Sequence, residues 1–117
     1  MLPAAARLRR RAEFTATVRG GVRSAAPAVV IHLRVPSEPS ADPARAGFVV
    51  SRAVGPAVVR NRVRRRLRHL AGPRLAELPG GSALVVRATP SAAALTGPEL
   101  ELQFDRGLQG ALARTNR

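Results

Sequence analysis

Residues 60–68 hold six arginines in nine positions and no acidic residue. At about 100° per residue, a helix through this stretch separates its apolar side chains from its charged ones. The apolar stripe consists of Val59, Val63, Leu67 and Leu70. The opposite side carries Asn61, Arg64, Arg65 and Arg68, with Arg62 beside them and Arg60 and Arg66 at the two borders. The stretch therefore predicts an amphipathic helix that docks on a core through one narrow face.

The charged face of this helix is unfavourable unless something neutralises it. Its arginines form three like-charged pairs at i,i+4, each of which opposes the helix by about 0.2–0.5 kcal/mol. The pairs are Arg60/Arg64, Arg62/Arg66 and Arg64/Arg68. A face that only had to be soluble could mix acidic and basic residues. We therefore interpret the field as the binding surface for a polyanion rather than as a solvated helix side.

The net charge of +13 is concentrated in the same part of the chain. Residues 1–70 contain fifteen arginines and three acids, whereas residues 71–117 contain five arginines and four acids. Such an excess points to nucleic acid or an anionic membrane. The predicted helix has a narrow aliphatic stripe and no aromatic anchor, which disfavours the membrane. No apolar run reaches 18 residues and no signal peptide opens the chain, so we expect a soluble cytoplasmic protein.

The patterning along the chain predicts a mixed α+β fold in one domain, residues 1–117. A basic lead-in precedes a short helix at 11–19, which should end at Gly20-Gly21 and bury Phe14 and Val18. Strands are expected at 27–35, 46–53 and 83–89, with a loop at 36–43. The basic helix should start after Gly55-Pro56, run over 56–70 and end at Gly72-Pro73. A capping box, Thr96-x-x-Glu99, predicts a last helix. Its apolar stripe would be Leu100, Phe104, Leu108 and Leu112.

The residues that could carry catalysis are few and scattered. The chain has no cysteine, which excludes a thiol nucleophile and a zinc finger. His32 falls on a strand and His69 near the expected end of the basic helix, where it would favour the helix dipole. Neither histidine has metal-ligand spacing or a carboxylate nearby in sequence, and Glu101 with Asp105 is most simply a solvent-facing pair. We expect no catalytic residues and no metal site in the protein, which favours a binding role.

The composition also narrows the kind of nucleic acid. Three phenylalanines and no tyrosine or tryptophan cannot supply the stacking platform of single-strand binders. Pro and Gly lead from a strand straight into the basic helix, unlike a helix-turn-helix. Structured RNA held through its phosphates and shape fits best. The alternatives are a structural rRNA-binding protein, a DNA-binding regulator and, least favoured, a stand-alone nuclease.

Two stretches resemble a known family. Residues 45–68, RAGFVVSRAVGPAVVRNRVRRRLR, resemble the pattern GxxVSKKxGxAVxRNRxKRxxR of the protein subunit of bacterial ribonuclease P. Residues 7–14, RLRRRAEF, are similar to the first segment of that family. The resemblance implies a two-layer α/β sandwich of a four-stranded sheet and three helices, of a kind also found in a ribosomal protein domain. It further implies a left-handed βαβ crossover.

The resemblance also implies a function. The chain would be the RNA-binding protein component of an endoribonuclease that removes the 5′ leader from precursor tRNA. Its RNA subunit would perform the hydrolysis with Mg²⁺ held mainly by RNA, and no protein partner would be needed. The residues implied to bind the RNA subunit are Arg60, Asn61, Arg62, Arg64, Arg65 and Arg68. Those implied to line a leader-binding cleft, between the first helix and the open sheet face, are Arg9, Phe14, His32, Phe48, Val50 and Arg52.

Overall fold

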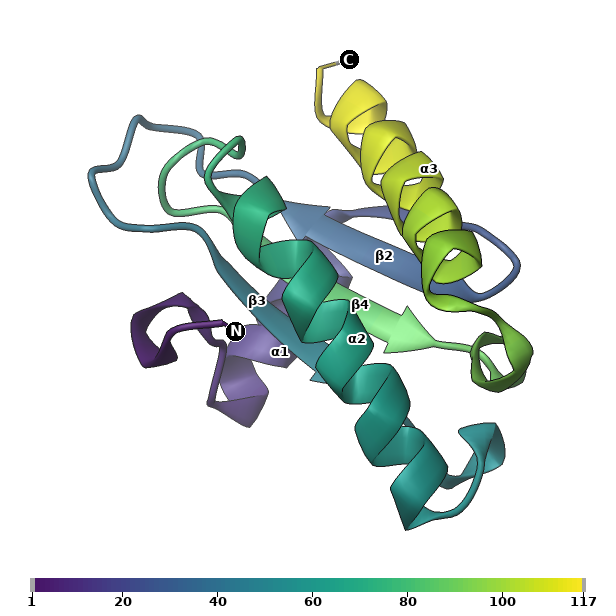
Figure 1. Cartoon of the computed structure of the whole chain (residues 1–117). Helices are drawn as coiled ribbons and strands as arrows, with labels where there is room; N and C mark the ends of the chain where they lie inside the picture. The colour runs from purple at the N-terminus through teal and green to yellow at the C-terminus, as the bar shows by residue number, and fades with distance from the viewer. Residues whose placement is uncertain (1, 117) are drawn as a thin grey trace.

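Four strands form one sheet in the order β1-β2-β4-β3 (Figure 1). The computed structural model describes residues 2–116. The strands are β1 (Val22–Ala25), β2 (Val29–Arg34), β3 (Arg45–Val49) and β4 (Ala83–Ala88). The helices are α1 (Arg11–Gly20), α2 (Ala57–Leu75) and α3 (Gly97–Thr115). Three short 3-10 helices, η1 (Ala4–Ala6), η2 (Arg52–Val54) and η3 (Pro90–Ala94), join them. The expected α+β class, with a four-stranded sheet and three helices, is confirmed.

The β3–α2–β4 connection is a parallel crossover within an otherwise antiparallel sheet. β3 pairs with β4 in parallel, whereas β2 pairs with both β1 and β4 in antiparallel fashion. In Figure 1, α2 lies in front of the sheet, and β3 and β4 both run toward the lower right. For an observer who stands on the α2 side of the sheet and looks along β3 in its own direction, β4 lies to the left of β3. The crossover is therefore left-handed, as expected, although nearly all such connections are right-handed.

The helices lie on both faces of the sheet, with α2 and α3 in front and α1 behind (Figure 1). Val29, Ile31 and Leu33 of β2 are fully buried on the front face. Gly107 brings α3 onto that face, since a Cβ there would come within 3.0 Å of the Ile31 side chain. The main sandwich is thus the sheet and the α2/α3 layer, and α1 crosses its reverse side. His32 alternates with the core residues and points toward α1.

The sequence analysis expected a fourth strand without giving its position, and it misplaced the ends of two elements. The fourth strand is β1, which pairs with β2 from Val22 opposite Leu33 to Ala25 opposite Val30. The second predicted strand ends at Val49 instead of 53, because the chain turns into η2. The basic helix runs to Leu75 and includes Pro73, whereas it was expected to end at Gly72-Pro73.

The extension of α2 has a packing cause. Ala71 is fully buried and Leu75 is 6 % exposed, so they continue the apolar stripe of Val63 and Leu67 beyond the expected end. Proline inside a helix costs about 3 kcal/mol, and burial of this further turn offsets that cost. His69 consequently lies six residues before the C-terminus of the helix, and its predicted role at the helix end is wrong.

The first and last helices agree with the sequence in different degrees. At the start of α3, Glu99 N donates to the Thr96 hydroxyl and Thr96 N donates to the Glu99 carboxylate, which confirms the capping box. Its stripe is buried at Leu100, Phe104 and Leu108, with Leu112 partly buried. In α1, Phe14 is half-buried as expected. Val18 is 37 % exposed, and Thr17 takes the buried position instead.

Candidate nucleic-acid interface

The face of α2 that points away from the core carries the predicted field of positive charge. Val63 and Leu67 are fully buried on the opposite side. Asn61 and Arg65 are exposed, and Arg64 and Arg68 are half-buried. Arg64 donates from Nη1 to Asn61 Oδ1 at 3.2 Å, so the asparagine orients one guanidinium of the field. We call Asn61, Arg64, Arg65 and Arg68 the α2 outer face.

The other three arginines of the stretch hold the helix in place. Arg60 Nε donates to the carbonyl of Gly55 at 3.1 Å. Arg62 and Arg66 each donate to a carbonyl of the segment after β4, at 3.0 Å, the acceptors being Ala93 and Leu95. The Nε of Arg62 is buried without an acceptor among residues 2–116. Arg62, predicted as an RNA contact, therefore has one group bonded to protein, its Nη2, and another, its Nε, buried.

The N-terminal lead-in adds an arginine that the sequence analysis did not include in the site. Arg7 forms a parallel bridge with Ala46, and Leu8 N donates to the Ala46 carbonyl at 2.8 Å. The lead-in therefore runs along the outer edge of β3, toward α2. Burial lowers the pKa of Arg68, and the nearby charges of Arg7 and Arg64 lower it further. Arg7 thus adds its charge to the positive field of the α2 outer face, although the two segments are far apart in sequence.

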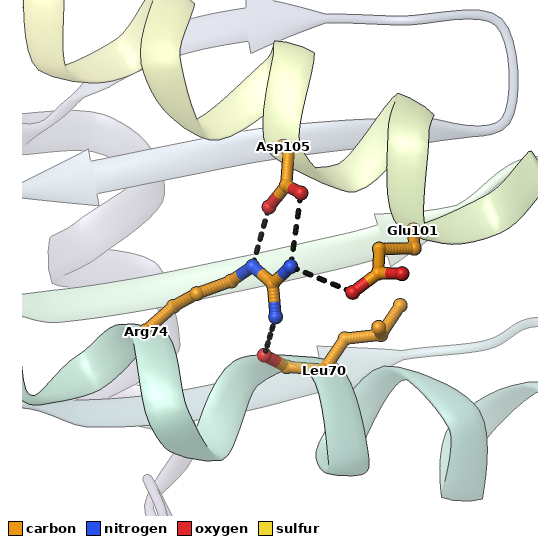
Figure 2. A network of polar contacts seen from close by, with 4 residues as sticks. All are labelled: Leu70, Arg74, Glu101 and Asp105. Carbon is orange, nitrogen blue, oxygen red and sulfur yellow. Dashed lines mark hydrogen bonds and ion pairs between the residues drawn. The ribbon is translucent and has the colours of Figure 1, made fainter. Parts of the chain in front are cut away.

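Arg74 belongs to the same helix but not to the field (Figure 2). Its guanidinium lies between α2 and α3 and pairs bidentately with Asp105 and, at 2.9 Å, with Glu101. It also donates to the Leu70 carbonyl at 2.8 Å and lies 5.7 Å from the ring centre of Phe104. These carboxylates raise its pKa. Glu101 and Asp105 are 49 % and 43 % exposed, in agreement with the expected solvent-facing pair, and α2 extends far enough to bring Arg74 to them.

The reverse face of the sheet carries part of the predicted cleft. The ring of Phe14 lies over Gly47 of β3, so close that a Cβ there would come within 2.3 Å of its Cζ. His32 is 6 % exposed, and its Nδ1 has no partner among the residues that the structure describes. Burial lowers its pKa, and the charges of Arg87 and Arg23 lower it further. Arg23 lies opposite His32 in the sheet register.

The structure does not bring the whole predicted cleft together. Phe48 pairs with Val86, which pairs with Ile31, so Phe48 lies on the front face under α2. Val50 is 6 % exposed within the same core. Arg52 is exposed in η2. Arg9 lies by a separate groove of the reverse face. Neither Phe48 nor Val50 can therefore line an open cleft with Phe14 and His32.

Neither a metal site nor a membrane span is found in the described part of the chain. Among residues 2–116, no three histidine or acidic side chains converge in a group that could hold a metal ion. Over the same residues, no helix combines the length and the hydropathy needed to cross a bilayer.

A left-handed βαβ unit that presents an arginine-covered helix defines a small nucleic-acid-binding protein of the α+β class. A family model described as Ribonuclease P matches residues 2–112. The ribonuclease P protein component of Salinispora tropica is 50 % identical and covers 100 % of this chain and 98 % of its own length. That of Streptomyces bikiniensis is 51 % identical, with 100 % of both chains covered. The chain belongs to the ribonuclease P protein family.

The fold agrees with solved members of this family. The structure of the Staphylococcus aureus RNase P protein has a TM-score of 0.81 to this chain at 24 % identity. It covers 92 % of this chain and 95 % of its own. That of Thermotoga maritima has a TM-score of 0.69, also at 24 % identity. At these identities the likeness shows that the fold is shared.

Proposed function

We propose that this chain is the RNA-binding subunit of a cytoplasmic ribonuclease P holoenzyme that removes the 5′ leader from precursor tRNA. The observation that carries the proposal is the α2 outer face. It presents Arg64, Arg65 and Arg68 around Asn61. Within residues 2–116, Arg45 and Arg74 are the arginines that form salt bridges, so no carboxylate neutralises this face. Phosphates of a folded RNA subunit would supply the missing negative charge.

The contribution of the protein would be electrostatic and positional. Arginine binds phosphate bidentately through a planar fork, and each phosphate that it neutralises releases condensed counterions. We assign the hydrolysis to the RNA subunit, because the two histidines offer no acid–base pair. His32 is largely buried on β2, and His69 lies on α2. Mg²⁺ would be held by RNA phosphates, because the chain offers no convergent set of oxygen ligands in its described part. The protein would lower the repulsion between two RNA molecules.

The reverse face of the sheet is our candidate for the leader. It combines the half-buried ring of Phe14 with His32, and Arg23 and Arg87 flank that histidine. A face that carries a half-buried aromatic ring and exposed arginines suits a single strand, whose bases can stack while its phosphates are neutralised. The sheet register favours Arg23 and Arg87 for this role over Phe48 and Val50, which lie in or against the core.

Reconstitution tests the main proposal. The chain is mixed with a bacterial ribonuclease P RNA at a Mg²⁺ concentration too low for the RNA alone, and 5′-leader release is measured. We expect cleavage to be restored only when both components are present, because the arginines replace part of the screening that Mg²⁺ otherwise provides. Cleavage without added RNA would contradict the absence of protein catalysis. No stimulation at any protein concentration would reject the proposed role.

Replacement of Phe14 by alanine tests the leader face separately. One lost base–aromatic contact is worth about 1–3 kcal/mol, so affinity for precursor tRNA should fall by about tenfold or more. Affinity for mature tRNA, which has no leader, should be unchanged. Leu102→Ala removes an exposed apolar side chain from α3, on the other face, and serves as the control. An equal loss for both RNAs would mean that Phe14 acts only through packing on Gly47.

A further inference from the structure

A groove of about 960 Å³ lies beneath the N-terminal lead-in, on the reverse side of the sheet. From α1 it is lined by Ala12, Glu13, Ala16 and Thr17. Ala12 and Ala16 lie on the flank of the helix opposite to Phe14, since a helix turns about 100° per residue, whereas Thr17 lies nearer to the side of Phe14. Phe14 and His32 do not line it. None of Asn61, Arg64, Arg65 and Arg68 lines it either, so the groove differs in its lining residues from both the leader face and the α2 outer face.

The lining of the groove is strongly basic. It includes five arginines and one acid, namely Arg7, Arg9, Arg10, Arg34, Arg45 and Glu13. Both carboxylate oxygens of the acid, Glu13, have partners within the protein. Glu13 Oε1 accepts a hydrogen bond from the backbone N–H of Arg10 at 3.1 Å, and its Oε2 pairs with Arg45. The hydrogen bonds lower the pKa of Glu13, so it is ionised at neutral pH. Arg9, Arg10 and Arg34 are exposed, and none forms a salt bridge within the described residues 2–116.

The remaining lining indicates what such a groove can hold. Its other residues are small or aliphatic, mainly alanines, and none is aromatic. Bases therefore find no ring to stack on, whereas phosphates find several guanidinium groups. The volume is near the upper end of that of pockets for single small ligands, about 300–1,000 Å³, and the groove is open. These properties suit a stretch of polyanion backbone that is bound without sequence preference.

The groove is continuous with the α2 outer face through Arg7. Arg7 lines the groove, and its charge also lowers the pKa of Arg68 on the α2 outer face. Its place is fixed, because the lead-in is bonded to Ala46 at the outer edge of β3, and Arg7 Nε donates to the Leu2 carbonyl at 3.0 Å. Leu2 is 1 % exposed and anchors the lead-in in the core. A strand leaving α2 at this edge would meet Arg7 and then the groove.

We propose that this groove is a third RNA-binding surface, in which Arg9, Arg10 and Arg34 hold the phosphates of an RNA-subunit strand that continues from the α2 outer face around the edge of β3. The inference rests on the proposed function, because it takes the RNA subunit as the occupant of α2. It adds a surface and a path for the strand. Arg9, which the sequence analysis assigned to the leader, is reassigned to this strand.

A pair of charge-removing variants tests the groove. Arg10→Gln with Arg34→Gln removes two of its arginines, and Arg106→Gln with Arg114→Gln removes two exposed arginines of α3 as the matched control. We expect the groove variant to bind the RNA subunit about tenfold more weakly at physiological salt. For two lost phosphate contacts, the slope of log K against log salt should fall by about 1.4. The control should change affinity by less than about twofold. Equal losses in the two variants would overturn the proposal.

An α2 variant measured in parallel distinguishes failure of the groove proposal from failure of the proposed function. If Arg65→Ala with Arg68→Ala weakens binding while the groove variant matches its control, the groove inference fails and the proposed function stands. If the α2 variant also binds normally, the proposed function fails with it. Loss of affinity in both variants, with an unaffected control, supports both.

Directed cleavage from single cysteines supplies a test that does not depend on charge removal. The chain has no cysteine of its own. A hydroxyl-radical reagent is attached at Ala12→Cys in the groove, at Val58→Cys on α2 or at Ala113→Cys on α3. All three positions are exposed. We expect Ala12→Cys to cut the RNA subunit at a site adjoining that cut from Val58→Cys, and Ala113→Cys to leave it intact. RNA that is cut from Val58→Cys but not from Ala12→Cys would refute the groove.

Discussion

Replacing Arg74 with alanine should lower the free energy of unfolding by about 2–3 kcal/mol, the range for hydrogen bonds to charged groups together with lost packing. The side chain is 19 % exposed and joins α2 to α3 through Asp105 and Glu101. Its truncation removes both ion pairs and the bond to the Leu70 carbonyl. It also uncovers the ring of Phe104, which is fully buried beneath the guanidinium.

The exposure of the carboxylates limits this loss. Glu101 is 49 % and Asp105 43 % exposed, so water can solvate both once Arg74 is gone. A fully buried pair broken on one side would cost about 3–5 kcal/mol, and exposed pairs are typically worth no more than about 1 kcal/mol. The bidentate geometry and the half-covered guanidinium place Arg74 between these limits.

Urea unfolding measures the effect. The midpoint should move to lower urea with an unchanged slope, since the surface exposed on unfolding is nearly the same. Arg106→Ala, an exposed arginine on α3, is the matched control and should change stability by less than about 0.5 kcal/mol. Asp105→Asn should reproduce part of the loss, and in the Arg74→Ala background it should add little, because the two residues act as a pair. Full additivity of the two losses would contradict the pairing seen in Figure 2.

The sequence predicted the parts of the fold in which local chemistry and packing agree. The strand predicted at 27–35 forms over Val29–Arg34, and the capping box at Thr96 forms as expected. Both depend on neighbours in sequence. The burial of Val63 and Leu67 follows from a 3.6-residue period in the same way. The arginine field could be recognised because like-charged pairs four residues apart destabilise a helix, and such pairs can be read directly from the sequence.

The remainder depends on partners far away in the chain. The strand β1 is only four residues long and of mixed character, and its pairing with β2 sets its conformation. Alternation shows that Phe48 and Val50 share a side, but only the pairing of β3 with β4 shows which helices cover that side. The helix continues through Pro73 because Leu75, beyond it, packs in the core and Arg74 pairs with Asp105. The acceptors of Arg62 and Arg66 are backbone carbonyls, which leave no signal in a sequence.

The structure divides the arginines of α2 into a group that bonds to the protein and a group that is available for RNA. Their spacing in the sequence does not show this division. Arg60, Arg62 and Arg66 donate to carbonyls of the protein. Arg64, Arg65 and Arg68 are left with the outer face, and Arg7 comes to lie near it. Substitutions in the first group should therefore act mainly on stability, and substitutions in the second mainly on RNA affinity. The contrast gives the strongest binding prediction an internal control.

The double variant Arg65→Ala, Arg68→Ala should lose about 3 kcal/mol of affinity for the RNA subunit, or roughly two orders of magnitude, since each charge-assisted contact is worth about 1.5–3 kcal/mol and neighbours are not fully additive. Its stability should be unchanged or slightly raised, because Arg68 is crowded by Arg64 and Arg7. Binding is measured by titration at several salt concentrations, alongside urea unfolding.

Arg62→Ala is the matched comparison and should lower stability more than it lowers RNA affinity. It removes the bond to Ala93 and should destabilise the fold by about 1–2 kcal/mol. If both variants lost affinity and stability in the same proportion, the outer face would have no role beyond that of a folded helix, and the RNA-subunit assignment would fail.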